Sequence, residues 1–76
     1  MEVKEKVFSR VAENMGVEKE SLKPETSFQE LGADSLDMVE FAIDVEEEFG
    51  IVVEQEDMSK IKTLGDAVQF IEGKLK

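Results

Sequence analysis

The chain has 76 residues, contains neither Cys nor His, and carries a formal net charge of −10. A chain of this length has room for one modest hydrophobic core and no deep catalytic cleft, so we expect residues 1–76 to form a single domain. Without Cys or His, a disulfide framework, a thiolate or imidazole metal site and most nucleophile–base pairs are excluded. We therefore do not expect an enzyme.

The negative charge is concentrated in the middle of the chain. Residues 24–59 contain twelve acidic side chains and no Lys or Arg, whereas residues 1–23 are balanced and residues 60–76 carry a small positive excess. Such a surface repels nucleic acid and anionic lipid and attracts basic proteins, at a rate that falls as salt screens the charge. We expect partners with basic docking surfaces and no nucleic acid. A surface that only keeps the protein in solution is the alternative.

Residues 3–15 are predicted to form the first helix. Their apolar residues recur at helical spacing, and Gly16 follows at the position of a left-handed terminator. The same segment has no apolar run long enough for a signal sequence or a transmembrane helix. We therefore expect a cytoplasmic protein without a membrane span.

Residues 17–33 have no sustained periodicity, and Pro24 lies among polar residues. This pattern predicts a long loop, which Leu22, Phe28 and Leu31 would anchor to the core. A loop of this length in so small a domain suggests a functional role.

The second long helix is predicted to follow this loop. Asp34 is placed as its N-cap, with Asp37 at the third helical position in a variant of the capping box, and Gly50 ends the helix after Phe49. Residues 55–60 favour a short helical turn. Residues 64–75 favour a last helix, which Thr63 and Asp66 cap in the same way.

Together these elements predict an all-α fold. We expect a small four-helix bundle with three long helices, one short helix and a long loop after the first helix. The apolar segment at residues 51–53 is too short, and has no partner, to indicate a sheet.

The second helix divides into three sectors when its residues are placed about 100° apart. The acidic sector consists of Asp37, Glu40, Asp44, Glu47 and Glu48. The sector expected to face the core consists of Met38, Phe41, Ala42, Val45 and Phe49. Leu36, Val39 and Ile43 form a third, apolar sector beside the acidic one. Apolar surface next to charge of one sign is typical of a protein-docking face. Alternatively, the third sector covers the adjacent loop.

Ser35 lies at the edge of this face, one residue inside the predicted cap. It fails as a catalytic nucleophile because the chain has no His to activate it. Two interpretations remain: a serine that only helps to begin the helix, or a serine that is modified. The free N–H groups and the dipole of a helix N-terminus would favour an attached phosphate.

Clustered carboxylates at residues 44–50 and 54–57 raise the alternative of a divalent-metal protein. An EF-hand loop beginning at Asp44 would place Gly50 at position 7 instead of 6, and Gln55 where a bidentate Glu is required. We expect no dedicated metal site and only weak cation binding.

The run SFQELGADSLDMVEFAIDVEEEFGI resembles the central segment of acyl carrier proteins, and the resemblance extends through KIKTLGDAVQFIE to both chain ends. Its core is LGADSLD. The resemblance implies a single acyl carrier domain over residues 1–76, in which a holo carrier protein synthase attaches 4′-phosphopantetheine from coenzyme A to Ser35. The arm would carry acyl chains as thioesters, and Asp34 matches the residue that precedes the modified serine in this family.

The resemblance also implies roles for two larger sets of residues. Partner docking would involve Leu36, Asp37, Glu40, Ile43 and Glu47, to which the sector pattern adds Val39, Asp44 and Glu48. The acyl pocket of the bundle interior would involve Phe28, Val45, Met58, Ile61, Ala67 and Phe70.

Two departures bear on the cargo. Residues 53–55 read VEQ where many fatty-acid carriers have Ile-Pro-Asp, and Met58 fills a position often held by a smaller residue. The acidic second helix and the compact length favour a carrier that serves fatty acid synthesis enzymes. We expect it to be a monomer. A specialised carrier for polyketide, lipid A or amino-acyl chemistry, and an acidic adaptor domain that is never modified, are the alternatives.

Overall fold

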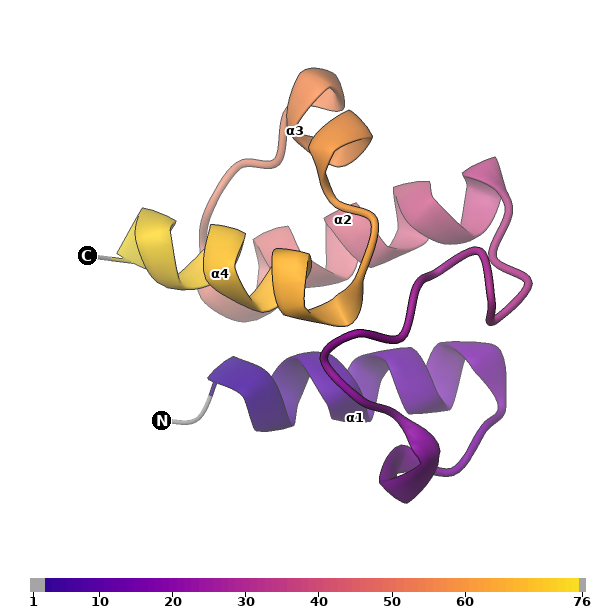
Figure 1. The fold of residues 1–76 in the computed structure, drawn as a ribbon. Helices are drawn as coiled ribbons and strands as arrows, with labels where there is room; N and C mark the ends of the chain where they lie inside the picture. Colours follow the sequence, from indigo (N-terminus) through magenta and orange to yellow (C-terminus); the bar gives the residue numbers. More distant parts are fainter. Residues whose placement is uncertain (1–2, 76) are drawn as a thin grey trace.

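The computed structural model describes residues 3–75, which form four α-helices and one short 3-10 turn (Figure 1). In chain order these are α1 (Val3–Met15), η1 (Lys19–Ser21), α2 (Ser35–Phe49), α3 (Gln55–Lys60) and α4 (Leu64–Leu75). Within residues 3–75 there is no strand, only an isolated bridge between Ser27 and Thr63. The predicted bundle of three long helices and one short helix is confirmed; the turn η1 was not predicted.

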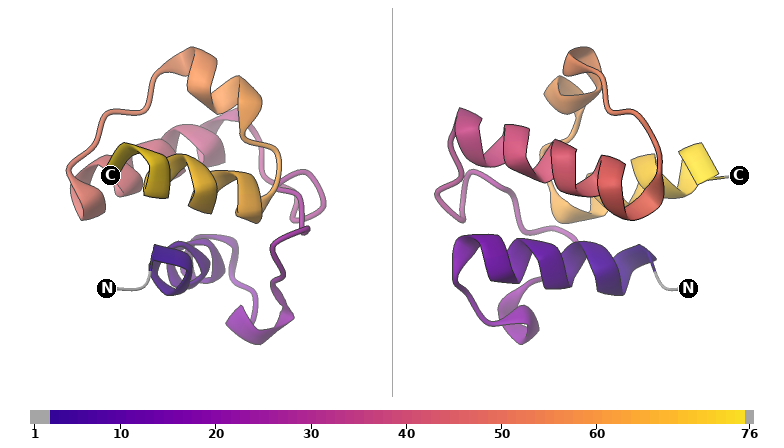
Figure 2. Two further views of the ribbon diagram at one scale, coloured as in Figure 1. Left: turned by 60° about the vertical axis from the view of Figure 1, so that its left-hand side comes forward. Right: turned by 180° about the vertical axis from the view of Figure 1, so that it is seen from behind.

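The three long helices pack side by side, and α3 lies apart from α1 on the far side of the bundle (Figure 2). α1 contacts both α2 and α4 and runs in the opposite direction to them. The start of α1 and the end of α4 consequently lie on the same side of the molecule. None of the helices in residues 3–75 has the length and apolar character needed to cross a membrane.

The core lies between the three long helices. Val7, Leu64 and Ile71 are its least accessible large side chains. The loop contributes Phe28, whose ring centroid lies 5.2 Å from that of Phe41 on α2. Burial of these side chains supplies the main driving force for folding, because each removes apolar surface from water.

The helix ends follow the predicted local signals. Gly16 and Gly50 have φ angles of 68° and 70°, a left-handed conformation that Gly adopts without steric cost, and they follow α1 and α2 directly. At the start of α4, Thr63 Oγ1 accepts a hydrogen bond from Asp66 N–H at 3.1 Å, and Asp66 Oδ2 accepts one from Thr63 N–H at 3.2 Å. The predicted cap is therefore present.

The long loop before α2 is tied to the start of α4. Leu22 and Phe28 are buried and Leu31 is partly buried against the core, as predicted. Leu64 N–H donates to Thr26 O at 3.0 Å, and Phe28 N–H donates to Lys62 O at 3.0 Å. These bonds hold the middle of the loop beside the residues at which α4 begins.

Candidate functional site

Ser35 is the first residue of α2 and is exposed to solvent. The cap before it is reciprocal: Asp34 Oδ1 accepts from Asp37 N–H at 3.0 Å, and Asp37 Oδ2 accepts from Asp34 N–H at 3.1 Å. Asp34 thus performs the capping, and the Ser35 hydroxyl is not needed for it. The prediction of Asp34 as N-cap is confirmed.

The helix start around Ser35 suits a phosphate group. Within residues 3–75, no protein group accepts a hydrogen bond from the backbone N–H of Ser35 or Leu36. Such unpaired N–H groups, together with the helix dipole, favour an anion at a helix N-terminus. The nearby carboxylates of Asp34 and Asp37 oppose an added negative charge, but each already accepts a backbone N–H bond. An exposed hydroxyl here fits a phosphodiester linkage.

A groove of about 660 Å³ runs between α2 and the segment that contains α3, and Ser35 lies at one end of it. Its α2 wall consists of Ser35, Met38, Val39, Ala42, Ile43 and Glu46. Its opposite wall consists of Val53, Gln55, Met58 and Ser59. Most of these side chains are apolar, so the groove can shelter an apolar chain that is tethered at Ser35.

Of the six residues predicted to form an acyl pocket, only Met58 lines this groove. Val45 and Ala67 are packed in the core, and Phe28 lies against Phe41 on the other side of α2 from the groove. The remaining two, Ile61 and Phe70, line a separate open depression between α3 and α4. The described residues thus do not bring all six together in one cavity, and their pocket role stays a prediction.

The groove includes residues that the sequence analysis did not assign to a site. Met38 and Ala42 were placed in the core sector, Glu46 was placed in none of the three sectors, and Val53 entered only as part of the departure at residues 53–55. A signal was present in the sequence: Ser35, Met38, Ala42 and Glu46 recur three or four residues apart, which places them on one face of a helix. The opposite wall could not be read in this way because it depends on where α3 packs.

The apolar sector of α2 is exposed, as predicted. Leu36 is 72% exposed, Val39 54% and Ile43 48%. They do not cover the adjacent loop, which excludes the alternative for this sector. Glu40 and Glu47 are exposed beside them. We call these five residues the exposed α2 face.

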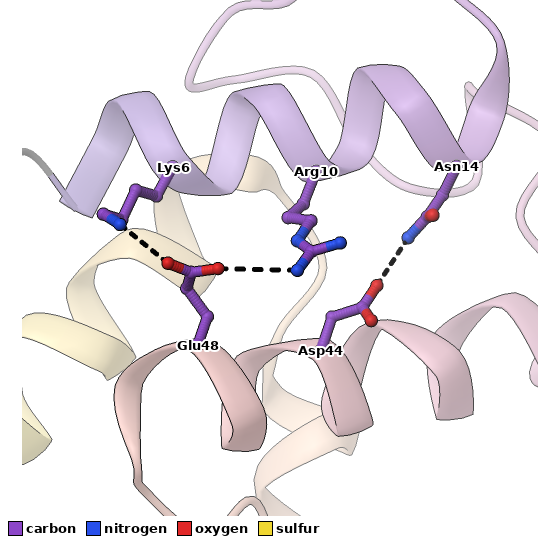
Figure 3. Close-up of polar contacts among 5 residues, drawn as sticks. All are labelled: Lys6, Arg10, Asn14, Asp44 and Glu48. Carbon is purple, nitrogen blue, oxygen red and sulfur yellow. Dashed lines mark hydrogen bonds and ion pairs between the residues drawn. The ribbon is translucent and has the colours of Figure 1, made fainter.

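Asp44 and Glu48 point away from this face and toward α1 (Figure 3). Glu48 Oε2 lies 2.7 Å from Lys6 Nζ, its Oε1 lies 3.4 Å from Arg10 Nη2, and Asp44 Oδ2 accepts a hydrogen bond from Asn14 Nδ2 at 2.9 Å. The sequence analysis assigned both carboxylates to partner docking. In the structure they join α1 to α2.

The ion pairs between α1 and α2 should make the stability of the fold depend on pH. The hydrogen bond from Lys6, followed by the charge attraction of Lys6, lowers the pKa of Glu48 below its ordinary value of about 4.5. A lowered pKa in the folded state adds stability above the ordinary pKa, and this contribution is lost as the pH falls through the lowered value.

We therefore expect the parent to be more stable than Glu48→Gln near pH 6, with a difference that shrinks as the pH falls below about 4.5. Urea unfolding of both proteins at several pH values checks this, and added salt should reduce the difference because the pairs are partly exposed. A difference that does not change between pH 6 and pH 3 would contradict it.

The acidic residues do not gather into a cation site. Nowhere in residues 3–75 do three or more His, Cys, Asp or Glu side chains converge as metal ligands. The carboxylates of α2 instead divide among the cap, the contact with α1, the exposed α2 face and, for Glu46, a bond to Val53 N–H.

Comparisons with known proteins identify the family. The model of the phosphopantetheine attachment site family, PP-binding, matches residues 5–71, a span that includes Ser35. The fold is similar to the crystal structure of an acyl carrier protein from Thermotoga maritima, with 35% sequence identity and a TM-score of 0.81 over 99% of this chain and 92% of that chain. The chain belongs to the phosphopantetheine attachment site family and has the acyl carrier protein fold. Its class is a carrier, not an enzyme, and its prosthetic group is covalently bound phosphopantetheine.

Proposed function

We propose that this protein carries acyl chains as thioesters on a 4′-phosphopantetheine arm attached to Ser35, and presents them to enzymes of fatty acid biosynthesis. The observation that carries the proposal is the exposed Ser35 at the start of α2, at the end of an apolar groove. Residues 1–76 would act as one carrier domain, monomeric and cytoplasmic.

Each residue near Ser35 has a distinct task in this proposal. The Ser35 hydroxyl forms the bond to the phosphate, and the free N–H groups of Ser35 and Leu36 stabilise the attached negative charge. Asp34 and Asp37 hold the start of α2 so that the hydroxyl faces solvent. When bound, the arm supplies a thiol, which a chain without Cys lacks.

The exposed α2 face is proposed as the surface that partners contact, including the holo carrier protein synthase. Its carboxylates would orient a basic partner, and Leu36, Val39 and Ile43 would supply apolar contact area. Asp37 contributes through the cap. We assign Asp44 and Glu48 an indirect part, because their contacts with α1 hold the helix in place.

For this face we expect Glu40→Lys to slow association with a fatty acid synthesis enzyme about tenfold at low salt, because a charge that steers the partner is reversed. Glu40 is exposed and makes no described side-chain hydrogen bond within residues 3–75, so the variant should fold normally. Surface plasmon resonance at two salt concentrations measures the rate. Glu72→Lys, an equal charge change on the exposed surface of α4, is the control. Equal rates for the parent and Glu40→Lys would contradict the proposal.

The fatty acid assignment is tested by supplying the arm-bearing protein to separate enzyme sets. We expect it to support chain elongation by purified fatty acid synthesis enzymes, with a much lower rate of loading by polyketide, lipid A or amino-acyl enzymes. The acidic α2 and the similarity to an acyl carrier protein favour this outcome. Elongation that fails while one of the other sets loads the protein would indicate the specialised carrier instead.

A further inference from the structure

One side-chain hydrogen bond joins α2 to the segment that leads into α3. Glu46 Oε2 accepts from Val53 N–H at 3.1 Å in a partly buried position. Glu46 lies on the last turns of α2, and Val53 lies in the extended stretch before α3. Within residues 3–75, no other side-chain hydrogen bond links α2 to this stretch or to α3.

Besides this bond, the partly buried side chains of Ile51, Val53 and Met58 pack against the core and help to hold α3. It has six residues, and none of them is buried. Its cap is local: Asp57 Oδ2 accepts a hydrogen bond from Glu54 N–H at 3.1 Å, and Asp57 N–H donates to Glu54 O at 3.0 Å. At its far end the buried Ile61 anchors the chain. The bond between Glu46 and Val53 adds a directional contact to this apolar packing and fixes where the stretch before α3 lies along α2.

Both partners of this bond also line the groove, at the end opposite Ser35. Eleven residue steps along α2 separate Ser35 from Glu46, which at about 1.5 Å per step corresponds to about 16 Å. Val39, Ala42 and Ile43 lie between them on the same wall. The bonded pair thus lies at the end of the groove away from the proposed attachment point.

We propose that Glu46 is a positioning residue that sets the length of the groove and thereby the longest acyl chain that it shelters. The inference rests on the proposed function, because the chain must be tethered at Ser35. Glu46 acts through Val53. Because the Glu46 carboxylate accepts the Val53 N–H, the stretch before α3 stays against the end of α2. An acyl chain that reaches this point meets the bonded pair and must extend into solvent.

Loss of the Glu46 carboxylate would leave the Val53 N–H without its hydrogen-bond acceptor. A partly buried N–H without an acceptor is costly, so the stretch around Val53 would move to reach water, and α3 would move with it. The far end of the groove would then open. Glu46→Gln keeps a carbonyl oxygen at the same distance from the backbone and should retain the bond in weaker form, whereas Glu46→Ala removes it.

Hydrogen exchange of the Val53 amide tests the bond itself. We expect exchange to be roughly tenfold faster or more in Glu46→Ala than in the parent, and intermediate in Glu46→Gln, because bonds to charged groups are the stronger ones. Glu72→Ala removes the same charge from an exposed position on α4 and should leave Val53 exchange unchanged. Equal exchange in Glu46→Ala and the parent would overturn the proposal.

The dependence of thioester protection on acyl chain length tests whether Glu46 sets the length of the groove. The parent and the three variants are loaded by a phosphopantetheinyl transferase with arms that carry saturated chains of increasing length, and thioester cleavage by hydroxylamine is timed. In the parent, protection of the thioester against cleavage should rise with chain length and then level off at the longest chain that the groove shelters. In Glu46→Ala it should level off at a longer chain, while Glu46→Gln and Glu72→Ala should resemble the parent.

If Glu46 only stabilised the fold, Glu46→Ala would change thioester protection equally for all chain lengths. If protection levelled off at the same chain length in Glu46→Ala as in the parent, the inference would be overturned. Intact mass, measured first, separates this result from failure of the proposed function. If the parent gained no arm, the carrier proposal would fail, and the inference with it. If the parent were loaded and the limit were unshifted, only the inference would fail.

Discussion

Replacing Ser35 by Ala is expected to abolish attachment of phosphopantetheine while the fold remains. The parent, incubated with coenzyme A, magnesium and a broad-specificity phosphopantetheinyl transferase, should gain the mass of one arm, and Ser35→Ala should gain none. Ser35 is exposed and its hydroxyl takes no part in the cap, which Asp34 supplies. Because Ala is also a favourable helix residue, α2 should form as before.

Ser59→Ala is the matched control for this experiment. Ser59 is exposed and lines the same groove, and its hydroxyl donates to Glu56 O within α3. This variant should take up the arm as the parent does. A mass gain in Ser35→Ala would place the attachment on another hydroxyl. No gain in a well-folded parent would instead favour the unmodified acidic adaptor.

Replacing Leu64 by Ala is expected to lower the free energy of unfolding by about 3 kcal/mol, because it leaves a cavity in the core. Leu64 is 0% exposed and is among the largest fully buried side chains of the core. In a domain of this size such a loss lowers the melting temperature by roughly 12 to 24 °C. Urea unfolding with an unchanged m-value would show that stability, and not the compactness of either state, has changed.

Leu75→Ala provides the control for this loss. It makes the same chemical change at the other end of α4, where the side chain is 46% exposed. We expect a loss below about 1 kcal/mol, since little apolar surface is returned to water. Equal losses for the two variants would mean that α4 is not anchored through its first turn.

Much of the local structure is determined by sequence alone. The ends of α2 follow from Asp34, Asp37 and Gly50, because caps and left-handed terminators involve residues only a few positions apart. The exposed apolar sector also follows, since helical periodicity states which side chains share a face and how many a small core can cover. The resemblance to acyl carrier proteins rested mainly on the stretch that contains α2, and the comparisons confirmed the resemblance.

Tertiary structure decided which neighbour each face of α2 meets. Glu48 belongs to the acidic sector by its angle on the helix, yet it bonds to Lys6, which lies 42 residues earlier in the chain. The groove depends in the same way on Val53 and Met58, whose positions are set by the path of the chain after Gly50. Periodicity gives a direction around one helix axis and contains no information about what packs there. That information resides in contacts between residues far apart in the sequence, which form only when the whole bundle closes.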